Sequence, residues 1–437
     1  MNAPRPPALP APRRRAWMRA SLAAAGACLA ARVPASSDPA APGGALPPVP
    51  APGATGPASR RAPQAPADPV RRGRAIMLPR DHGAHLGSRI EWWYVTGWLR
   101  SGAAPRVGNG SGAGGTVHAG DVAPGDPRVL RGFQITFFRT RTGLAEDLGG
   151  RFAPRHLLFA HAALSTPATG RHEHEERIAR WSGEPAASSR VRAALHDADL
   201  RLFDWTLRRE TTGAGTLDGR WDADFSTGTH RLQLRMARTQ ALLLQGEAGW
   251  SRKGPQPQQA SHYLSEPQLQ VEGQVRGLGG APEAVHGRAW LDHEWSDELL
   301  HPEAVGWDWI GINLDDGSAL TAFRLRRADG SALWAGGSFR AAGAATARAF
   351  GPDEVVFTPG RTWRSPGSGA AYPVEWTVAT PAGTHGLRAL MDAQEMLGRS
   401  ATGTVYWEGL STLHAADGRR VGLGYLEMTG YAGRLVL

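Results

Sequence analysis

The stretch His286–Gly317 reads HGRAWLDHEWSDELLHPEAVGWDWIGINLDDG and holds four tryptophans around the cluster Asp292-His293-Glu294. A carboxylic acid among indole rings loses hydration, so its pKa rises and it can hold a proton near neutral pH. Indole faces can also stabilise a developing positive charge. The stretch therefore predicts a site in which Asp292 donates a proton to an apolar or cationic species. The alternative is a barrel core in which Asp292 is a turn carboxylate bonded to backbone N–H groups.

The same stretch ends in a strand followed by a turn, and this pattern recurs along the chain. Asp315-Asp316-Gly317-Ser318 is a typical hairpin turn. Apolar and polar residues alternate at 133–137, 232–236 and 374–378, which is typical of half-buried strands. No sustained helical periodicity follows the first 33 residues. The sequence therefore predicts an all-β protein.

A faint internal repeat is visible in two aromatic hairpins. Glu91–Leu99 leads, after a loop, into Gly132–Arg139, and Trp307–Leu314 leads, after a short turn, into Leu320–Arg326. In both, an aromatic strand precedes an apolar strand that ends in arginine. This repeat indicates two related β-domains.

We place the boundary between these domains near Glu272–Ala281, which gives β-barrel or β-sandwich domains at residues 78–272 and 273–437. The glycine-rich segment Ser101–Arg128 is interpreted as an insertion in the first hairpin. It matches no phosphate-binding fingerprint, because no strand-to-helix context surrounds its glycines.

The first residues are typical of an export signal. Arg14–Arg19 resembles the twin-arginine pattern, and the alanine-rich apolar segment Ser21–Ala31 follows it. We expect residues 1–33 to be the signal, residues 34–77 to be a disordered Pro/Ala/Gly-rich linker, and the protein to be periplasmic or secreted. Cys28, the only cysteine, would tether the chain to a membrane if it carried a lipid.

Charge and metal-ligand patterns exclude two classes of function. The formal net charge is +9, but residues 1–78 hold eleven arginines and two aspartates, so the remainder is neutral. A nucleic-acid-binding domain would carry its basic residues on the fold itself. His82-X-X-His85 and His172-X-His174 have ligand-like spacing, but no CxxC or HExxH motif supports them. We therefore predict no nucleic-acid partner, no metal and no cofactor.

Several long aromatic motifs together resemble the AttH/CrtC family, from about Leu78 to the last residue. They are DHGAH at Asp81–His85, EWWYVTGW at Glu91–Trp98, GFQITFFR at Gly132–Arg139, DHEWS at Asp292–Ser296, GWDW at Gly306–Trp309, YWEG at Tyr406–Gly409 and GYLEMTGY at Gly424–Tyr431. The family contains exported proteins often called secreted hydrolases, together with the carotenoid 1,2-hydratases. The resemblance implies a fold of two tandem lipocalin-like β-domains.

The resemblance also implies an acid-catalysed reaction. In the hydratases an acid protonates a terminal isoprenoid double bond, and water captures the resulting tertiary carbocation. Their essential aspartate falls on Asp292 here and is likewise followed by a histidine, His293. The hydratase tyrosine two residues earlier is Trp290, and the upstream histidine and tryptophan fall near Tyr263 and Ser265. The acid is thus kept while three partners differ, and the chain is more similar to the AttH side, whose reaction is not settled.

Strand alternation assigns these candidates to faces. His293 and Glu294 point to opposite sides of a strand, and Glu294 shares the side of Asp292. Glu294 would either raise the pKa of Asp292 as a like charge or pair with an arginine. Glu91 would either face a cavity or pair with an arginine inside a barrel. With Asp292 as the catalytic residue, the candidate ligand-binding residues are Trp290, His293, Trp295, Trp307, Trp309, Glu91, Trp93, Tyr263 and Tyr406.

Two classes of function remain. A conventional serine hydrolase is not supported, because no G-x-S-x-G motif occurs. The first hypothesis is an enzyme that hydrates or cyclises an isoprenoid-like or lipid substrate, enclosed between or within the barrels. The alternative is a non-catalytic carrier of a hydrophobic small molecule, since aromatic-walled barrels can enclose one small ligand.

Overall fold

The computed structural model describes most of the chain beyond the expected signal and linker. It describes residues 69–102, 130–144, 153–184, 186, 189–211, 219–298, 300–398 and 404–435. All of these belong to one compact unit, Ser59–Leu437. Residues 1–68, Cys28 and most of the Ser101–Arg128 insertion lie outside the described residues, so the export signal and the tether stay predictions. Within the described ranges no helix is long and apolar enough to cross a membrane.

The last part of the expected linker contacts the folded domain. The Arg72 guanidinium lies 2.8 Å from the Glu247 carboxylate. The Arg74 guanidinium lies 3.3 Å from the Asp81 carboxylate, which also accepts the backbone N–H of Met77 at 2.7 Å. The folded region therefore begins before Leu78, because arginines of the linker find carboxylate partners on the domain.

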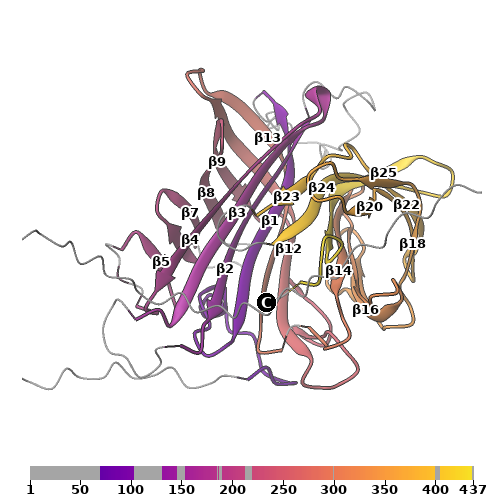
Figure 1. Ribbon diagram of the computed structural model, residues 1–437, viewed down its shortest axis with the longest axis horizontal. Coiled ribbons are helices and arrows are strands. Elements are labelled where there is room, and N and C mark those ends of the chain that lie inside the picture. The colour runs from indigo at the N-terminus through magenta and orange to yellow at the C-terminus, as the bar shows by residue number, and fades with distance from the viewer. Residues whose placement is uncertain are drawn as a thin grey trace, which may run out of the picture. The chain divides into compact units, whose positions relative to one another are not determined.

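The first sheet has thirteen antiparallel strands, shown from indigo to rose in Figure 1. The main order is β4-β3-β2-β1-β13-β12-β9-β8-β7-β6-β5, and β10 and β11 pair with β12. The strands are β1 (Ile90–Ser101), β2 (Leu130–Arg141), β3 (His156–Thr166), β4 (Arg171–Trp181), β5 (Val191–Ala193), β6 (Asp199–Leu202), β7 (Trp205–Glu210), β8 (Arg220–Thr227), β9 (His230–Ala237), β10 (Leu243–Leu244), β11 (Trp250–Arg252), β12 (Ala260–Gly277) and β13 (Glu283–Ser296). The edge strands β4 and β5 approach each other, so the sheet nearly closes into a barrel.

The second sheet has ten antiparallel strands, orange to yellow in Figure 1. Its main order is β17-β16-β15-β14-β25-β24-β22-β21-β18, and β23 pairs with β24. The strands are β14 (Gly306–Leu314), β15 (Ala319–Arg326), β16 (Ala332–Arg340), β17 (Arg348–Phe350), β18 (Val356–Pro359), β21 (Glu375–Thr380), β22 (Gly383–Ala389), β23 (Glu395–Leu397), β24 (Val405–His414) and β25 (Arg420–Thr429).

The remaining elements are small. β19 (Thr362–Arg364) and β20 (Ala371–Pro373) form a separate hairpin, and the 3₁₀ turns η1 (Arg80–His82) and η3 (Pro167–Thr169) are the only helical elements among the described residues. The all-β prediction is confirmed.

The transition between the sheets lies later than the boundary expected at residues 272/273. That boundary falls inside β12, and both β12 and β13 belong to the first sheet. β13 pairs with β12 on one side and with β1 on the other, with Tyr94 opposite Asp292. The chain enters the second sheet only between Ser296 and Gly306, because β13 is needed to complete the first.

The two aromatic hairpins repeat one structural device. Glu91 on β1 lies opposite Arg139 on β2, and Asp308 on β14 lies opposite Arg324 on β15. Each pair forms a buried salt bridge with a nitrogen–oxygen distance of 2.8 Å. The internal repeat seen in the sequence thus corresponds to an equivalent cross-strand ion pair in each sheet.

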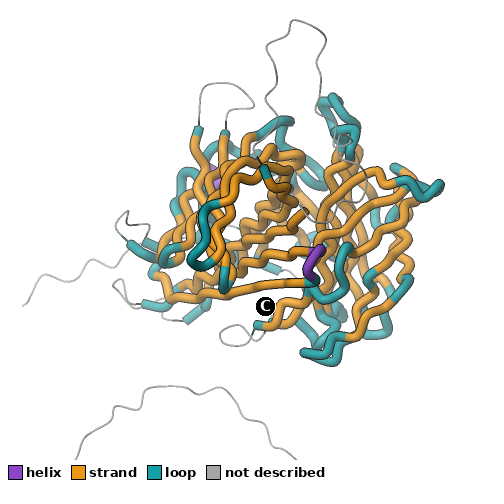
Figure 2. Tube along the Cα trace, turned by 90° about the horizontal axis from the view of Figure 1, so that it is seen from above, coloured by secondary structure: helices purple, strands orange, loops and turns teal. Residues whose placement is uncertain are grey.

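Alternate residues on β1 and β14 contribute to different apolar cores. Trp93 and Val95 pack in the core of the first sheet, and Ile310 packs in the core of the second. Tyr94 and Trp309, one position away, pack together in a third core between the sheets. Figure 2 shows the two curved sets of strands from above. Each sheet therefore fills its own interior and presents its other face to its neighbour.

Candidate active site

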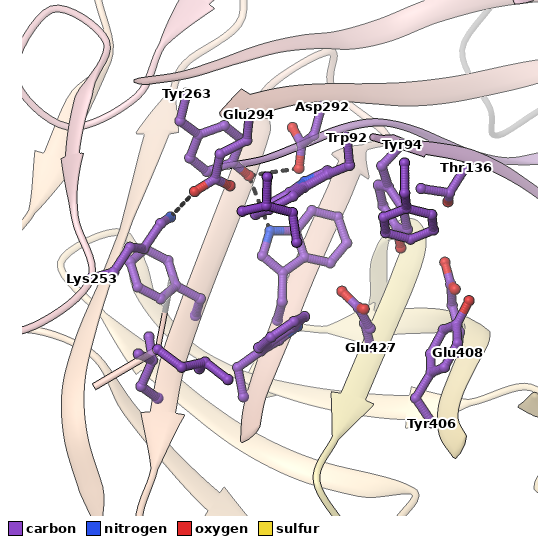
Figure 3. Close-up of a pocket in the computed structure, with 17 residues that line it drawn as sticks. Trp92, Tyr94, Thr136, Lys253, Tyr263, Asp292, Glu294, Tyr406, Glu408 and Glu427 are labelled. Carbon is purple, nitrogen blue, oxygen red and sulfur yellow. Dashed lines mark hydrogen bonds and ion pairs between the residues drawn. The ribbon is translucent and has the colours of Figure 1, made fainter. Parts of the chain in front are cut away.

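The candidate site is a pocket between the two sheets, not the interior of either one. The first sheet contributes side chains from β1, β2, β12 and β13, and the second contributes side chains from β14, β15, β24 and β25 (Figure 3). The part of the pocket that a water-sized sphere can occupy has a volume of about 90 Å³, and the pocket is partly open to solvent. It is lined by Ile90, Trp92, Tyr94, Thr136, Phe138, Lys253, Tyr263, Asp292, Glu294, Leu300, Trp307, Trp309, Phe323, Leu325, Tyr406, Glu408 and Glu427.

Asp292 lines this pocket and is only 3% exposed. Its Oδ1 accepts the Ser265 hydroxyl at 2.5 Å and the Trp290 indole N–H at 2.7 Å. Its Oδ2 accepts the Tyr263 hydroxyl at 2.6 Å. All three donors are side chains, so Asp292 is neither a turn carboxylate held by backbone N–H groups nor one half of an arginine pair.

A chain of hydrogen bonds fixes which oxygen of Asp292 can carry a proton. The Ser338 hydroxyl donates to the Gln245 Oε1, and the Gln245 amide donates to the Ser265 hydroxyl at 2.9 Å. Ser265 must then donate its own hydrogen to Asp292 Oδ1. An indole nitrogen can only donate, so Oδ1 is an acceptor from both of its partners. The proton of a neutral Asp292 therefore belongs on Oδ2, next to Tyr263.

The environment of Asp292 favours its neutral form. Burial raises the pKa of Asp292 from 3.8 to about 7, although the three donors oppose the rise and the nearby Glu294 adds to it. A carboxyl with a pKa near neutrality can release and regain a proton under the same conditions. Asp292 is thus a buried acid with access to an aromatic pocket.

Glu294 shares the pocket with Asp292, as alternation predicted, but its partner is a lysine. The Lys253 ammonium lies 3.0 Å from Glu294 Oε1, which also accepts the Ser261 hydroxyl. The same ammonium lies 4.5 Å from the centre of the Tyr263 ring and 4.3 Å from that of Phe323. Lys253 is the only lysine in the chain, and it neutralises a carboxylate in the pocket wall.

Glu91 belongs to a second buried cluster on the other face of β1 and β13. Its carboxylate contacts His85 Nδ1 at 2.7 Å, His293 Nε2 at 3.0 Å and Arg139 Nε at 2.8 Å. Burial alone would raise the pKa of Glu91, but the charges of His85 and Arg139 and the hydrogen bonds hold it well below its usual value. His85, Glu91 and His293 are close enough to hold a metal ion. However, the Arg139 cation and the ring nitrogens already occupy the carboxylate, so the cluster fits an ion-pair network better.

The aromatic residues of that cluster also face away from the pocket. Trp93 donates its indole N–H to the backbone oxygen of His82 at 2.9 Å and stacks on His293 with ring centres 4.6 Å apart. Trp295 stacks on His85 at 3.7 Å. These contacts pack β13 against β1 and the segment that precedes it.

The structure therefore separates the candidate residues into two groups. The pocket is lined by Asp292, Tyr263, Trp307, Trp309 and Tyr406. Trp290 does not line it but donates a hydrogen bond to Asp292. The group that lies in the second cluster and not at the pocket is Glu91, Trp93, His293 and Trp295.

Several pocket residues were not singled out from the sequence, among them Tyr94, Lys253 and Glu427. A signal existed for each. Lys253 is the sole lysine, Tyr94 lies within EWWYVTGW, and Glu427 lies within GYLEMTGY. Tyr94 and Glu427 could have been selected if the face that each strand turns toward the other sheet had been known.

Comparison with known proteins places this geometry in context. A family described as AttH-like matches residues 125–431. The crystal structure of a Nitrosomonas europaea protein with a suggested AttH assignment is 43% identical, with a TM-score of 0.69, and covers 83% of this chain and 99% of its own. Kievitone hydratase from Nectria haematococca is 13% identical, with a TM-score of 0.56, and covers 85% of this chain and 98% of its own. No curated protein sequence matches the chain significantly. The expected fold class, all-β with two tandem lipocalin-like β-domains, is confirmed.

Proposed function

Because the chain belongs to the AttH-like family, as its motifs predicted, we propose that it is an acid-catalysed hydratase acting on an apolar alkene in the pocket between the sheets. The observation that carries the proposal is the state of Asp292. Its pKa is raised to about 7 by burial, and it lines an aromatic pocket without a basic partner. The resemblance in fold to kievitone hydratase is consistent with this reaction class.

Each step of the reaction has a residue suited to it. The proton on Asp292 Oδ2 is transferred to one carbon of the double bond, which leaves a carbocation on the other. The aromatic faces of Trp92 and Trp309, which line the pocket, stabilise the cation. Water captures the cation and loses a proton, so the net change is addition of H and OH. An internal double bond in place of water would give cyclisation instead.

The three positions that differ from the carotenoid hydratases turn out to share one role. Tyr263, Ser265 and Trp290 are the three donors to the Asp292 carboxyl. Charged or buried acceptors gain from such donors, so the set stabilises the carboxylate that forms when Asp292 loses its proton. The residues at these three positions therefore give the acid hydrogen-bond support.

Incorporation of oxygen-18 from water into the products formed by the full chain tests the proposal. The protein is incubated in oxygen-18 water with linear carotenoids, other isoprenoid alkenes and kievitone, and products are analysed by mass spectrometry. We expect one added hydroxyl carrying the label for at least one alkene, and none with heat-unfolded protein. A hydrophobic molecule that co-purifies with the chain and is returned unchanged, with no labelled product from any probe, would instead identify a carrier.

A further inference from the structure

Two more carboxyl groups lie on the pocket wall opposite Asp292. Glu408 on β24 and Glu427 on β25 are direct cross-strand partners in the second sheet, and both line the pocket. Figure 3 shows them on the strands across the pocket from Asp292 and Glu294. Directly opposed side chains have Cβ atoms about 4.5–5.5 Å apart, and two like charges at that distance destabilise a sheet. The pair is therefore unfavourable when both carboxyls are ionised.

No cation among the described residues compensates this pair. The pocket's ammonium, on Lys253, is bound to Glu294, and no salt bridge reaches Glu408 or Glu427 in the described part of the chain. Glu408 is 2% exposed, and neither of its carboxyl oxygens makes a hydrogen bond of normal geometry to a described residue. An isolated buried carboxylate costs several kcal/mol and takes up a proton instead.

The surroundings of the two carboxyls also favour their protonated forms. Burial, and then the charge of Glu427, raise the pKa of Glu408 well above its usual value, while the nearby Tyr94 and Tyr406 hydroxyls oppose the rise only in part. Burial raises the pKa of Glu427 to about 7, with Trp307 opposing the rise. Glu427 is partly exposed, whereas Glu408 is buried.

We propose that Glu408 and Glu427 share one proton and form a second proton-transfer centre, which takes the proton released by the water that attacks the carbocation. This proposal rests on the proposed hydration. Asp292 gives its proton to carbon, water forms the carbon–oxygen bond, and the proton that leaves the water passes to the unprotonated carboxyl of the pair. Solvent then returns one proton to Asp292 and removes one from the pair, so all atoms and charges balance.

The geometry assigns different tasks to the two carboxyls. Glu427, the more exposed one, would take the proton from the attacking water, and the buried Glu408 would hold the shared proton. Because Asp292 is on the other sheet, the hydrogen and the hydroxyl would add from opposite sides of the bound alkene. In inverting glycosidases an acid and a base likewise act from opposite faces of the substrate.

Substitution of either glutamate tests the pair in the full chain. Glu427→Gln and Glu408→Gln keep the side-chain shape, and each is assayed in D₂O with an alkene that the wild type hydrates. We expect alcohol formation to fall at least about 100-fold, in line with the loss of one general base. Deuterium should still enter the recovered alkene, since Asp292 can protonate it reversibly. Asp292→Asn should lose both signals, and the control Glu272→Gln, at an exposed position of β12, should lose neither. Hydration at the wild-type rate by both glutamine variants would overturn the proposal.

A second measurement needs no substrate. In the Asp292→Asn background, infrared spectra near pH 7 report the carbonyl stretch of protonated carboxylic acids. We expect this band to be weakened or shifted by Glu408→Gln and also by Glu427→Gln, because one proton is shared, and to be unchanged by Glu272→Gln. A spectrum that neither glutamine variant alters would overturn the shared proton. If the wild type hydrates no alkene, the proposed function and the role as a base fall together, whereas the band still decides whether the pair shares a proton.

Discussion

Asparagine at position 292 is expected to abolish alkene hydration while leaving the fold and ligand binding in place. The amide has the shape of the protonated acid, and its oxygen can still accept from Ser265 and Trp290, which donate to Asp292 Oδ1. It cannot donate a proton to carbon. Since general acids contribute about 10²–10⁴-fold to rates, labelled hydroxyl incorporation should fall by that factor or to background. Mass spectrometry of products formed in oxygen-18 water provides the measurement.

The control for this variant is Asp353→Asn, which changes an exposed aspartate in the second domain. It should hydrate alkenes at the wild-type rate. Binding of the alkene to Asp292→Asn is measured by the quenching of tryptophan fluorescence. The affinity should remain close to that of the wild type because the aromatic walls are unchanged. Hydration by Asp292→Asn at more than a tenth of the wild-type rate would rule out Asp292 as the acid.

As pH rises, the free energy of unfolding of Asp292→Asn is expected to increase relative to that of the wild type. Between pH 4 and pH 7 folded wild type holds a proton on Asp292 that the unfolded chain has lost, because the pKa of Asp292 is raised from 3.8 to about 7. Its stabilising contribution is complete below pH 4 and is lost as pH rises through 7. At 1.36 kcal/mol per pKa unit, this loss is roughly 4 kcal/mol. Asparagine does not titrate, so the difference in unfolding free energy should move by that amount in its favour.

Denaturant unfolding of both proteins at pH 4, 6 and 8 measures this change. Glu408 and Glu427 are present in both proteins, so their titration largely cancels in the difference. Parallel stability curves for wild type and Asp292→Asn over this range would show that the carboxyl is ionised throughout, which would remove the physical basis of its role as an acid.

Much of the fold could be predicted because it depends on local patterns. Alternation and turn residues are properties of short segments, and they predicted strands throughout. The paired hairpins were visible because each carries an aromatic strand and a terminal arginine, Arg139 and Arg326 in the sequence pattern. The arginine that faces the acid in the second hairpin is Arg324, two residues earlier on the same face, with Arg326 3.5 Å from the same carboxylate. The sequence pattern thus indicated an arginine at the end of the hairpin, but not that Arg324 is the one that pairs with Asp308.

The site was only half accessible from the sequence. Alternation correctly put Asp292 and Glu294 on one face and His293 on the other, because neighbours on a strand point in opposite directions. It could not tell which face of β1 meets the second sheet. Trp92 and Tyr94 line the pocket, whereas Trp93 lies in the core of the first sheet. That choice depends on how the two sheets pack, and nothing in the composition of EWWY distinguishes its two faces.

The carboxyl groups of the pocket's second wall could not be derived for the same reason. Glu427 and Asp292 are brought together by packing between sheets, not by spacing along a strand. The position of the domain transition was missed because β12 and β13 form a long hairpin whose turn, at residues 278–282, looks like a linker in sequence. Long glycine-rich hairpin tips and linkers share the same turn residues.

Methionine at position 139 is expected to destabilise the fold by about 3–5 kcal/mol, because it leaves the Glu91 carboxylate buried without its arginine. Arg139 is fully buried and also donates to the backbone oxygens of His85 and Ser88 at 2.7 and 2.9 Å. The equivalent change in the second sheet, Arg324→Met, should cost less. There, Arg326 lies 3.5 Å from the Asp308 carboxylate, and the Tyr431 hydroxyl also donates to that carboxylate.

Denaturant unfolding at neutral pH measures both effects, with Arg327→Met as the matched control. Arg327 pairs with Glu303 at the surface, where an ion pair contributes about 0–1 kcal/mol. Adding Glu91→Gln to Arg139→Met should restore part of the lost stability, since it removes the uncompensated charge. A cost below about 1 kcal/mol for Arg139→Met would mean that the histidines around Glu91 suffice to hold it.

The Arg139 result bears on function because the ion-pair network and the acid lie on opposite faces of one pair of strands. Glu91 lies opposite Trp295 and Tyr94 lies opposite Asp292 in the pairing of β1 with β13. A one-residue slip of that pairing would turn Asp292 away from the pocket. The network of Glu91, Arg139 and His293 bonds across these strands and resists such a slip. In Arg139→Met protein that remains folded, alkene hydration should therefore fall together with stability, although Arg139 never contacts the pocket.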